Sequence, residues 1–344
     1  MNRAFTRRWL AAGFAIAACL IVVVPGAFAA PRYTKTLTPI AVTATRIAAF
    51  DNRDPTRVRF GALEFRGGLV LTSSHDAFGG ISALHVEPDG SHFLAVTDNG
   101  SWLRGRIVYD KGKPAGIADA EMAPLLGPDG RAVAARGWFD SESLAESDGA
   151  LYVGIERVEK IVRFDYAHHG LSARGEPIDV PADFKTFTYN KSLECLAVPP
   201  KGAALAGQLI AVTERSLDAA GNHRSFLFDA GRVARFTVKH SDDFDVSDCT
   251  VVPPGDLLLL ERRFSLARGV AIRIRRIALA GIAPGALVDG TPLIEADLAY
   301  QIDNMEGIAV HRNAAGETII TLVSDDNFSV LQRTLLLQFA IVGE

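Results

Sequence analysis

The sequence predicts an all-β protein, a β-propeller of five or six four-stranded blades. A short signature recurs five times at intervals of 52 to 60 residues, and the copies are separated by strand-like runs and turn signals. Apart from an apolar N-terminal run, no segment shows the sustained helical spacing of apolar residues. Strand-rich repeats with a period of about 40–50 residues or slightly more are typical of propeller blades.

Each copy of the signature begins with an acidic or polar residue, followed by a small residue and a short apolar run. The first residues of the five copies are Ser82, Glu142, Glu194, Asp248 and Glu306. A second polar cluster closes the strand that follows each copy, at residues 97–99, 156–157, 214–215, 261–262 and 324–327. Because equivalent positions of all blades surround one central channel, we expect these acids to converge although they are far apart in sequence.

Turn signals and chain ends indicate how the propeller is organised. Gly-containing turns at residues 88–90, 147–149, 253–255 and 313–316 separate the first and second strands of four repeats, as in meander hairpins. The last repeat runs out after three strands, so we expect the strand-like residues 57–71 to join the C-terminal blade and close the sheet edges. The propeller domain is predicted at residues 57–344. Residues 30–56 form an N-terminal arm or part of a divergent sixth blade.

The N-terminus has the pattern of a cleaved export signal. Three arginines within the first eight residues precede an apolar run at residues 9–24 and a small-residue cleavage site at residues 27–29. The pair Arg7 and Arg8 resembles a twin-arginine export motif, and Cys19 loosely fits a lipoprotein box, although the apolar run continues after it. A retained anchor is the alternative, since a membrane span needs about 20 apolar residues. We expect cleavage after Ala29, a periplasmic or secreted bacterial protein and no stable membrane span.

The charge balance disfavours nucleic acid as a partner. The chain has a formal net charge of −4, and removal of residues 1–29 takes away three arginines and no acids, which gives −7. An acidic exported protein is a poor ligand for polyanions but a plausible binder of cations. We expect a monomer that binds a small anionic, phosphorylated substrate with the help of a cation.

Two cysteines outside the N-terminal signal stand where other copies of the signature have small residues. Cys195 and Cys249 follow Glu194 and Asp248 directly. They are either two buried small residues or a disulfide, which an oxidising compartment permits if their Cα atoms lie within about 7 Å. The spacing leaves both alternatives open.

The repeated acids and amides are the oxygen ligands that Ca²⁺ prefers. Clustered carboxylates without a cation repel one another, which raises their pKa values. The expected metal ligands are Asp98, Asn99, Glu194, Asp248, Asp325 and Asn327. The expected catalytic groups are Glu142, Glu306 and Asp326. The structural alternative is that such acids accept backbone N–H groups of the next blade.

Three of the second clusters pair an acid with an arginine, as in inter-blade salt bridges or an anion-binding site. The expected substrate-binding cations are Arg157, Lys191, Arg215 and Arg262. A metal together with arginine suits hydrolysis of phosphoric esters, because negative charge must be neutralised during the reaction. Other catalytic motifs are missing from the sequence: residues 80–84 lack the last Gly of G-x-S-x-G, and no H-E-x-x-H, C-x-x-C, Walker or dinucleotide pattern occurs.

Several of these segments together resemble the phytase-like domain family, also called "esterase-like activity of phytase". The matching segments are residues 78–84, 97–100, 139–144, 303–309, 324–328 and 334–337. The resemblance covers roughly residues 58–340 and implies an exported β-propeller whose repeated Glu and Asp residues are suspected of phosphodiester or phytate-type hydrolysis. The chain departs from calcium-dependent propeller phytases and histidine acid phytases, since it lacks D-A-x-D-D-P-A and R-H-G-x-R-x-P.

Three functions are therefore expected in order of preference. The first is a Ca²⁺-assisted hydrolase of phosphomono- or phosphodiesters. The second is a metal-propeller lactonase or carboxylic-ester hydrolase. The third is a non-catalytic periplasmic propeller that binds a ligand or a protein and has a purely structural cation.

Overall fold

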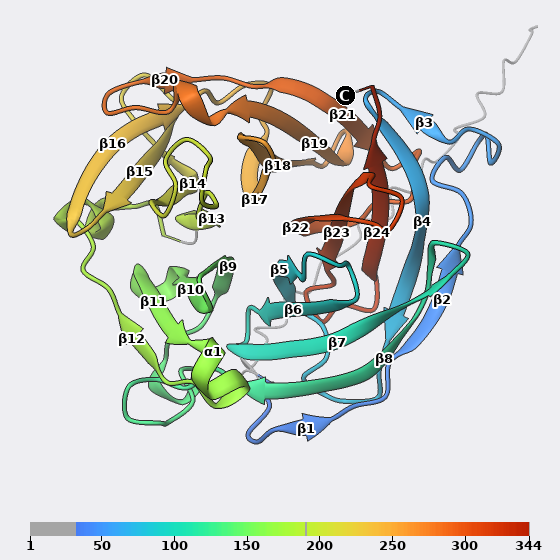
Figure 1. Cartoon of the computed structure of the whole chain (residues 1–344), viewed down its shortest axis with the longest axis horizontal. Helices are drawn as coiled ribbons and strands as arrows, with labels where there is room; N and C mark the ends of the chain where they lie inside the picture. The colour runs from blue at the N-terminus through green and yellow to red at the C-terminus, as the bar shows by residue number, and fades with distance from the viewer. Residues whose placement is uncertain (1–31, 190, 344) are drawn as a thin grey trace, which may run out of the picture. The chain divides into compact units, whose positions relative to one another are not determined.

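The computed structural model describes residues 32–189 and 191–343, in which the strands form five sheets arranged as a five-blade β-propeller (Figure 1). This confirms the predicted fold class and fixes the number of blades at five. The predicted four strands per blade hold only in part, since the sheets contain five, four, five, four and six strands. The predicted export signal and Cys19 lie outside the described residues. In the part of the chain that is described, no helix is both long and apolar enough to cross a bilayer.

Each blade begins with its innermost strand and meanders outward. The first blade contains β5 (Ile81–Val86), β6 (His92–Thr97), β7 (Ser101–Asp110), β8 (Lys113–Pro124) and the edge strand β1 (Thr38–Pro39). The second contains β9 (Ser141–Ser147), β10 (Ala150–Ile155), β11 (Lys160–Asp165) and β12 (Gly175–Pro177). The third contains β13 (Leu193–Ala197), β14 (Leu209–Leu217), β15 (His223–Asp229), β16 (Arg232–Val238) and a parallel edge strand, β20 (Leu287–Val288).

The fourth and fifth blades complete the propeller. The fourth contains β17 (Asp245–Val252), β18 (Asp256–Ser265), β19 (Gly269–Ala278) and β21 (Thr291–Asp297). The fifth contains β22 (Asn304–Arg312), β23 (Thr318–Asp325), β24 (Thr334–Ile341), β4 (Leu63–Thr72) and β2 (Thr43–Ile47), and β3 (Arg59–Phe60) pairs with β4. The helical segments are short: α1 (Tyr166–His169), η1 (Ala134–Arg136), η2 (Glu156–Val158), η3 (Gly170–Ser172), η4 (Ala182–Thr186) and η5 (Leu279–Gly281).

The N-terminal segment contributes edge strands to two blades and builds no blade of its own. Strand β1 pairs with β8, where Thr38 lies opposite Met122, and β2 pairs with β4, where Thr43 lies opposite Thr72. Strand β4 in turn pairs antiparallel with β24 of the C-terminal segment. Residues 38–47 therefore act as an arm across the first and fifth blades, and the alternative of a sixth blade is wrong.

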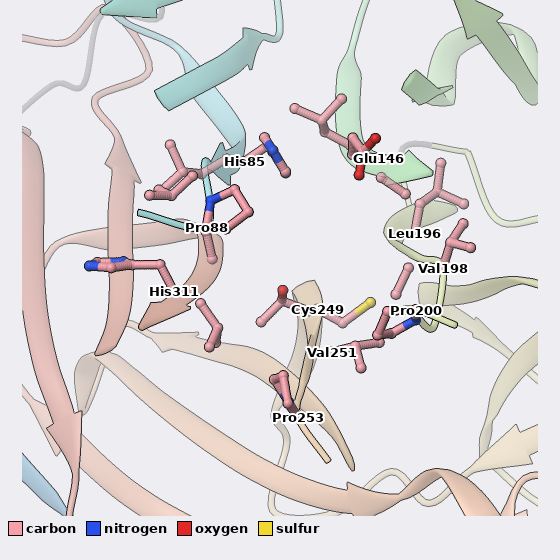
Figure 2. Close-up of a pocket in the computed structure, with 18 of the residues that line it drawn as sticks. His85, Pro88, Glu146, Leu196, Val198, Pro200, Cys249, Val251, Pro253 and His311 are labelled. Atoms are coloured by element: carbon pink, nitrogen blue, oxygen red, sulfur yellow. The ribbon is translucent and has the colours of Figure 1, made fainter. Parts of the chain in front are cut away.

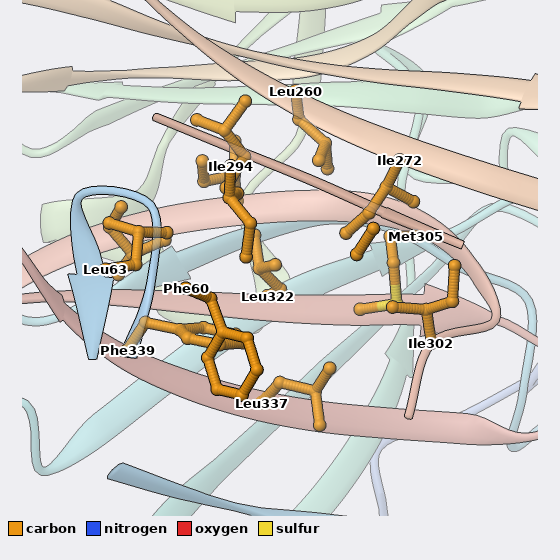
Figure 3. Packing of buried hydrophobic residues seen from close by; sticks show 14 of the residues in the cluster. Phe60, Leu63, Leu260, Ile272, Ile294, Ile302, Met305, Leu322, Leu337 and Phe339 are labelled. Carbon is orange, nitrogen blue, oxygen red and sulfur yellow. The ribbon is translucent and has the colours of Figure 1, made fainter. Parts of the chain in front are cut away.

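The hydrophobic core lies between neighbouring blades. Inner strands such as β23 are buried along their whole length, because adjacent blades cover both faces, and this explains their near-continuous apolar runs. Figure 3 shows the cluster between the fourth and fifth blades, where Leu260, Met305 and Phe339 pack together with further apolar side chains. Burial of each such side chain contributes about 1.5–3 kcal/mol to the free energy of unfolding.

A β-bulge at the start of each innermost strand sets which side chains face the channel. The register shifts show that the bulged residues are Ser82, Glu142, Glu194, Ser247 and Glu306. In the fourth blade the bulge falls at Ser247, so Asp248 matches Cys195 and not Glu194. The predicted alignment of that copy is therefore wrong by one residue.

The two cysteines form a disulfide between the third and fourth blades. Cys195 on β13 is bonded to Cys249 on β17, and their Cα atoms are 5.1 Å apart. Of the two alternatives left open by the sequence, the structure selects the disulfide. The prediction that both cysteines occupy one repeat position is wrong, because Cys249 lies one residue further along its strand than Cys195.

Candidate functional site

Two positions in every blade bring polar side chains to one end of the channel. The first is the bulged residue of the innermost strand. The second lies near the end of the neighbouring strand. The residue just before the bulge pairs with a residue of that strand, and the next residue along the chain is the second position. In the five blades this position holds Asp98, Glu156, Glu214, Arg262 and Asp325. Of the ten positions, seven carry carboxylates. We call these seven the carboxylate ring: Asp98, Glu142, Glu156, Glu194, Glu214, Glu306 and Asp325.

The carboxylates act on one another across blades. Burial raises the pKa of Glu142 well above its usual value, and Glu306 and Asp98, from the fifth and first blades, add to this shift. Burial and the charge of Glu306 likewise raise the pKa of Asp98 to about 8. The pKa of Asp325 is raised well above its usual value by burial, Glu306 and Asp98. Acids that are up to about 230 residues apart in sequence therefore share one electrostatic environment.

Arg262 supplies a positive charge from the fourth blade. Its Nη1 lies 2.9 Å from Glu306 Oε1 and donates to Asn304 Oδ1 at 2.6 Å, and its Nη2 lies 3.5 Å from Glu214 Oε1. Burial opposes its charged form, but Glu306 and Glu214 raise its pKa overall. The guanidinium therefore stays charged and divides the carboxylate ring into two groups.

The first group, which we call the upper group, consists of Asp98, Glu142, Glu306 and Asp325 from the first, second and fifth blades. Asn304 Nδ2 donates to Glu306 Oε1 at 2.8 Å. Asp98 Oδ1 is buried and has no hydrogen-bond partner. Gly80 makes room for Asp98: its φ is +60°, and a Cβ atom there would lie 2.2 Å from Asp98 Oδ1.

The second group, which we call the glutamate triad, consists of Glu156, Glu194 and Glu214 from the second and third blades. One carboxylate oxygen of each lies within 4.8 Å of the other two, and all three residues are buried. Lys191 Nζ lies 2.7 Å from Glu214 Oε1 and is the nearby counter-ion from the third blade. Among the described residues, these three form the only set of three or more acidic, His or Cys side chains in which one ligand atom of each lies within 4.8 Å of the others.

Two predicted site residues in the fifth blade shape the loop after β23. Asp326 Oδ1 accepts hydrogen bonds from the backbone N–H groups of Gly80 and Phe328, at 3.0 and 3.1 Å, and Oδ2 accepts one from Thr334 Oγ1 at 2.9 Å. Both oxygens of Asp326 are thus engaged: Oδ1 ties this loop to Gly80 beside the first blade, and Oδ2 ties it to β24 of the fifth blade. Asn327 is exposed and donates its backbone N–H to Asp325 Oδ1 at 2.6 Å.

Asp248 lies in the junction between the fourth and fifth blades and outside the carboxylate ring. Its Oδ2 accepts the backbone N–H of Ile308 at 2.7 Å, and its Oδ1 accepts that of Cys249 at 2.7 Å. This is the structural alternative that the sequence left open for repeated acids. Asp248 was predicted as the metal ligand of the fourth repeat, but the two channel-facing positions of that blade hold Ser247 and Arg262.

The other predicted cations lie at the mouth of the channel. Arg157 Nε lies 3.1 Å from Asp140 Oδ2, and Arg215 Nη1 lies 3.3 Å from Asp245 Oδ2. Their side chains are 40% and 47% exposed, so each is paired with an acid and still open to solvent. Asn99, half-buried, follows Asp98 directly.

Glu156 and Glu214 were not predicted as site residues, because each precedes an arginine in the sequence. Their repeat position, which they share with Asp98 and Asp325, is the signal that identifies them. In the fourth blade the same position holds Arg262, whereas Glu261 faces away from the ring and accepts hydrogen bonds from Arg273 and Arg275.

A separate cavity of about 390 Å³ lies at the other end of the innermost strands (Figure 2). Apolar residues such as Leu196, Val198 and Val251 line it, together with His85 and Glu146. No member of the carboxylate ring lines this cavity. The polar chemistry and this hollow therefore lie at different ends of the channel.

Comparison with solved structures finds only distant similarity. An aldose sugar dehydrogenase from Streptomyces coelicolor, in its PQQ-bound form, is 13% identical with a TM-score of 0.41, over 88% of this chain and 99% of that chain. A glutaminyl cyclase from Myxococcus xanthus is 12% identical with a TM-score of 0.40, over 77% and 92%. Likeness at this level supports no conclusion about function.

Comparison with families of known proteins is more informative. No curated protein matches the chain. The family model described as "Phytase-like: Esterase-like activity of phytase" matches residues 76–328, which include the whole carboxylate ring. The chain belongs to this phytase-like family.

Proposed function

We propose that the chain is a Ca²⁺-assisted hydrolase of phosphoric esters and that the upper group of the carboxylate ring is its active site. The observation that carries this proposal is the convergence of seven carboxylates from four blades around the guanidinium of Arg262. Membership of the phytase-like family supports the same class of reaction.

The upper group fits a hard divalent cation. Its donors are carboxylate oxygens, which Ca²⁺ prefers, and Asp98 Oδ1 is a buried oxygen without a hydrogen-bond partner. Burial and mutual repulsion disfavour the charged forms of Asp98 and Asp325, and a cation would offset both effects. Asp98 and Asp325 would hold Ca²⁺, which when bound supplies Lewis-acid neutralisation of phosphoryl charge.

The side chains around these two ligands have complementary roles in the proposal. Arg157, Arg215 and Lys191 attract and orient the anionic ester at the mouth of the channel. Burial raises the pKa values of Glu142 and Glu306, which favours their protonated forms, so either side chain can serve as a general acid. As water adds to phosphorus and the ester P–O bond breaks, such an acid donates its proton to the oxygen of the leaving group, and the proton that the attacking water loses returns to the carboxylate.

Replacement of Glu142 by Gln tests this role. The variant Glu142→Gln keeps the size of the side chain and removes the acid, so kcat should fall by about 10²–10⁴-fold. The assay is turnover of a panel of phosphomono- and phosphodiesters by purified protein, with Ca²⁺ and with chelator. Glu146→Gln is the matched control, because Glu146 lies on the same strand but is exposed and lines the opposite cavity.

Equal turnover by Glu142→Gln and the control would remove Glu142 from the mechanism. If wild-type protein with Ca²⁺ hydrolyses no ester of the panel, the proposed function is wrong. Turnover of a lactone or carboxylic ester in place of phosphoesters would select the second candidate function.

A further inference from the structure

Each junction between neighbouring blades is tied close to the carboxylate ring. The ties are a backbone bond from Asp140 to Asp98, the bond from Ser192 to Glu156, the disulfide, the bond from Ile308 to Asp248 and the bond from Gly80 to Asp326. At the junction of the second and third blades, Ser143 Oγ donates to the backbone oxygen of Leu193 at 2.9 Å. The other tie at this junction is made by Glu156, a member of the glutamate triad.

The glutamate triad contains an unsatisfied buried group. Glu156 accepts the backbone N–H of Ser192, and Glu214 accepts Lys191. Glu194 is only 4% exposed, and its Oε2 has no hydrogen-bond partner. An unpaired buried carboxylate is costly, so buried charges in proteins are paired or bind metals. Arg262 acts on Glu194 electrostatically, but no described group donates a hydrogen bond to Glu194 Oε2, so a bound cation would satisfy this oxygen.

The geometry of the triad suits one ion. Ca²⁺ binds oxygen at about 2.3–2.6 Å, so two oxygens on opposite sides of one ion lie about 4.8 Å apart. One oxygen from each of the three residues lies within 4.8 Å of the other two. The set contains neither His nor Cys, so a hard cation such as Ca²⁺ is favoured over zinc or copper.

We propose that Glu156, Glu194 and Glu214 bind a second divalent cation of the Ca²⁺ type, which ties the second blade to the third. This site is distinct from the cation of the proposed function, since Arg262 lies between the triad and the upper group. The role is structural: the ion would neutralise the three glutamates that the second and third blades bring together, and so stabilise the junction that Glu156 helps to tie. It does not depend on whether the protein hydrolyses phosphoesters.

Calcium binding by three proteins tests the second site. Purified protein is freed of metal with a chelator, exchanged into chelator-free buffer and titrated with CaCl₂ in a calorimeter. Wild type should bind two ions, Glu194→Gln one, and the control Glu146→Gln two. In parallel, the rise in melting temperature that CaCl₂ produces should be at least halved in Glu194→Gln. Glu156→Gln provides a second variant should Glu194→Gln fold poorly.

The outcomes separate this site from the proposed function. Unchanged stoichiometry in both triad variants overturns the second site. Loss of one ion supports it, even if no phosphoester is hydrolysed. If wild type binds a single ion and Glu194→Gln abolishes binding, the triad site stands and the site at Asp98 and Asp325 is wrong.

Discussion

Protein freed of divalent cations should melt at a lower temperature at pH 9 than at pH 7. Burial and neighbouring carboxylates raise the pKa of Asp98 to about 8, and burial raises that of Glu156 to about 7. In the unfolded chain both groups titrate near pH 4. The folded protein therefore binds more protons between these values, and stability is lost as the pH rises through the folded pKa values.

The size of this effect follows from the number of retained protons. Each retained proton is worth about 1.4 kcal/mol of unfolding free energy per pH unit, so a fall of several degrees is expected. The comparison of melting temperatures begins at pH 7 because below about pH 6.5 the buried His223 changes stability in the opposite direction. Burial and the positive charges of His240 and Arg275 lower the pKa of His223 to about 3, so its protonation in the unfolded chain favours unfolding in acid.

Calcium should reverse the trend. With CaCl₂ present, the cation neutralises the carboxylates, so the melting temperature should be nearly constant from pH 7 to pH 9. The measurement is differential scanning calorimetry of the same preparation with chelator and with CaCl₂. A melting temperature that is flat or rises with pH in the chelated sample would show that the carboxylates are not held in a shared buried environment.

Replacement of Glu261 by Gln should destabilise the fourth blade strongly. Glu261 is fully buried on β18 and accepts hydrogen bonds at 2.8 Å from Nε of both Arg273 and Arg275. Those arginines are also buried, and their other carboxylate partners, Asp242 and Asp289, are 69% and 49% exposed. The substitution leaves two buried guanidinium groups without their shared carboxylate, which costs about 3–5 kcal/mol.

Chemical denaturation measures this loss, and Glu295→Gln is the control. Glu295 is half-exposed on β21 of the same blade, and its ion pair with Arg263 is long at 3.8 Å. Its replacement should therefore change stability by about 0.5 kcal/mol or less. Calcium binding by Glu261→Gln should remain that of wild type, because Glu261 faces away from the ring. A loss below about 1 kcal/mol, or a loss of bound calcium, would contradict this placement.

The repeat in the sequence was sufficient to predict the propeller and the innermost strands. It misplaced the site by one residue in the fourth blade, because a β-bulge adds a residue to one strand without a sequence signal. A slip of one residue reverses which side chains face the channel. For this reason Glu261 was aligned with Glu214, whereas in the structure Arg262 occupies that position.

Other features depended on three-dimensional distances that the spacing of residues does not define. The disulfide joins Cys195 and Cys249, which are offset by one residue in the repeat. Together with the arginines that follow them, Glu156 and Glu214 were interpreted as inter-blade salt bridges or anion-binding groups. In the structure the arginines lie at the mouth of the channel, and the two glutamates are buried in the triad.

The location of bound metal in crystals of the protein tests the central claim most directly. Crystals grown with CaCl₂, or with Mn²⁺ as an anomalous substitute, should show an ion within about 2.6 Å of carboxylate oxygens of Asp98 and Asp325, among side chains drawn from several blades. An anomalous map with ions bound only outside the channel, and none between these carboxylates, would contradict the account.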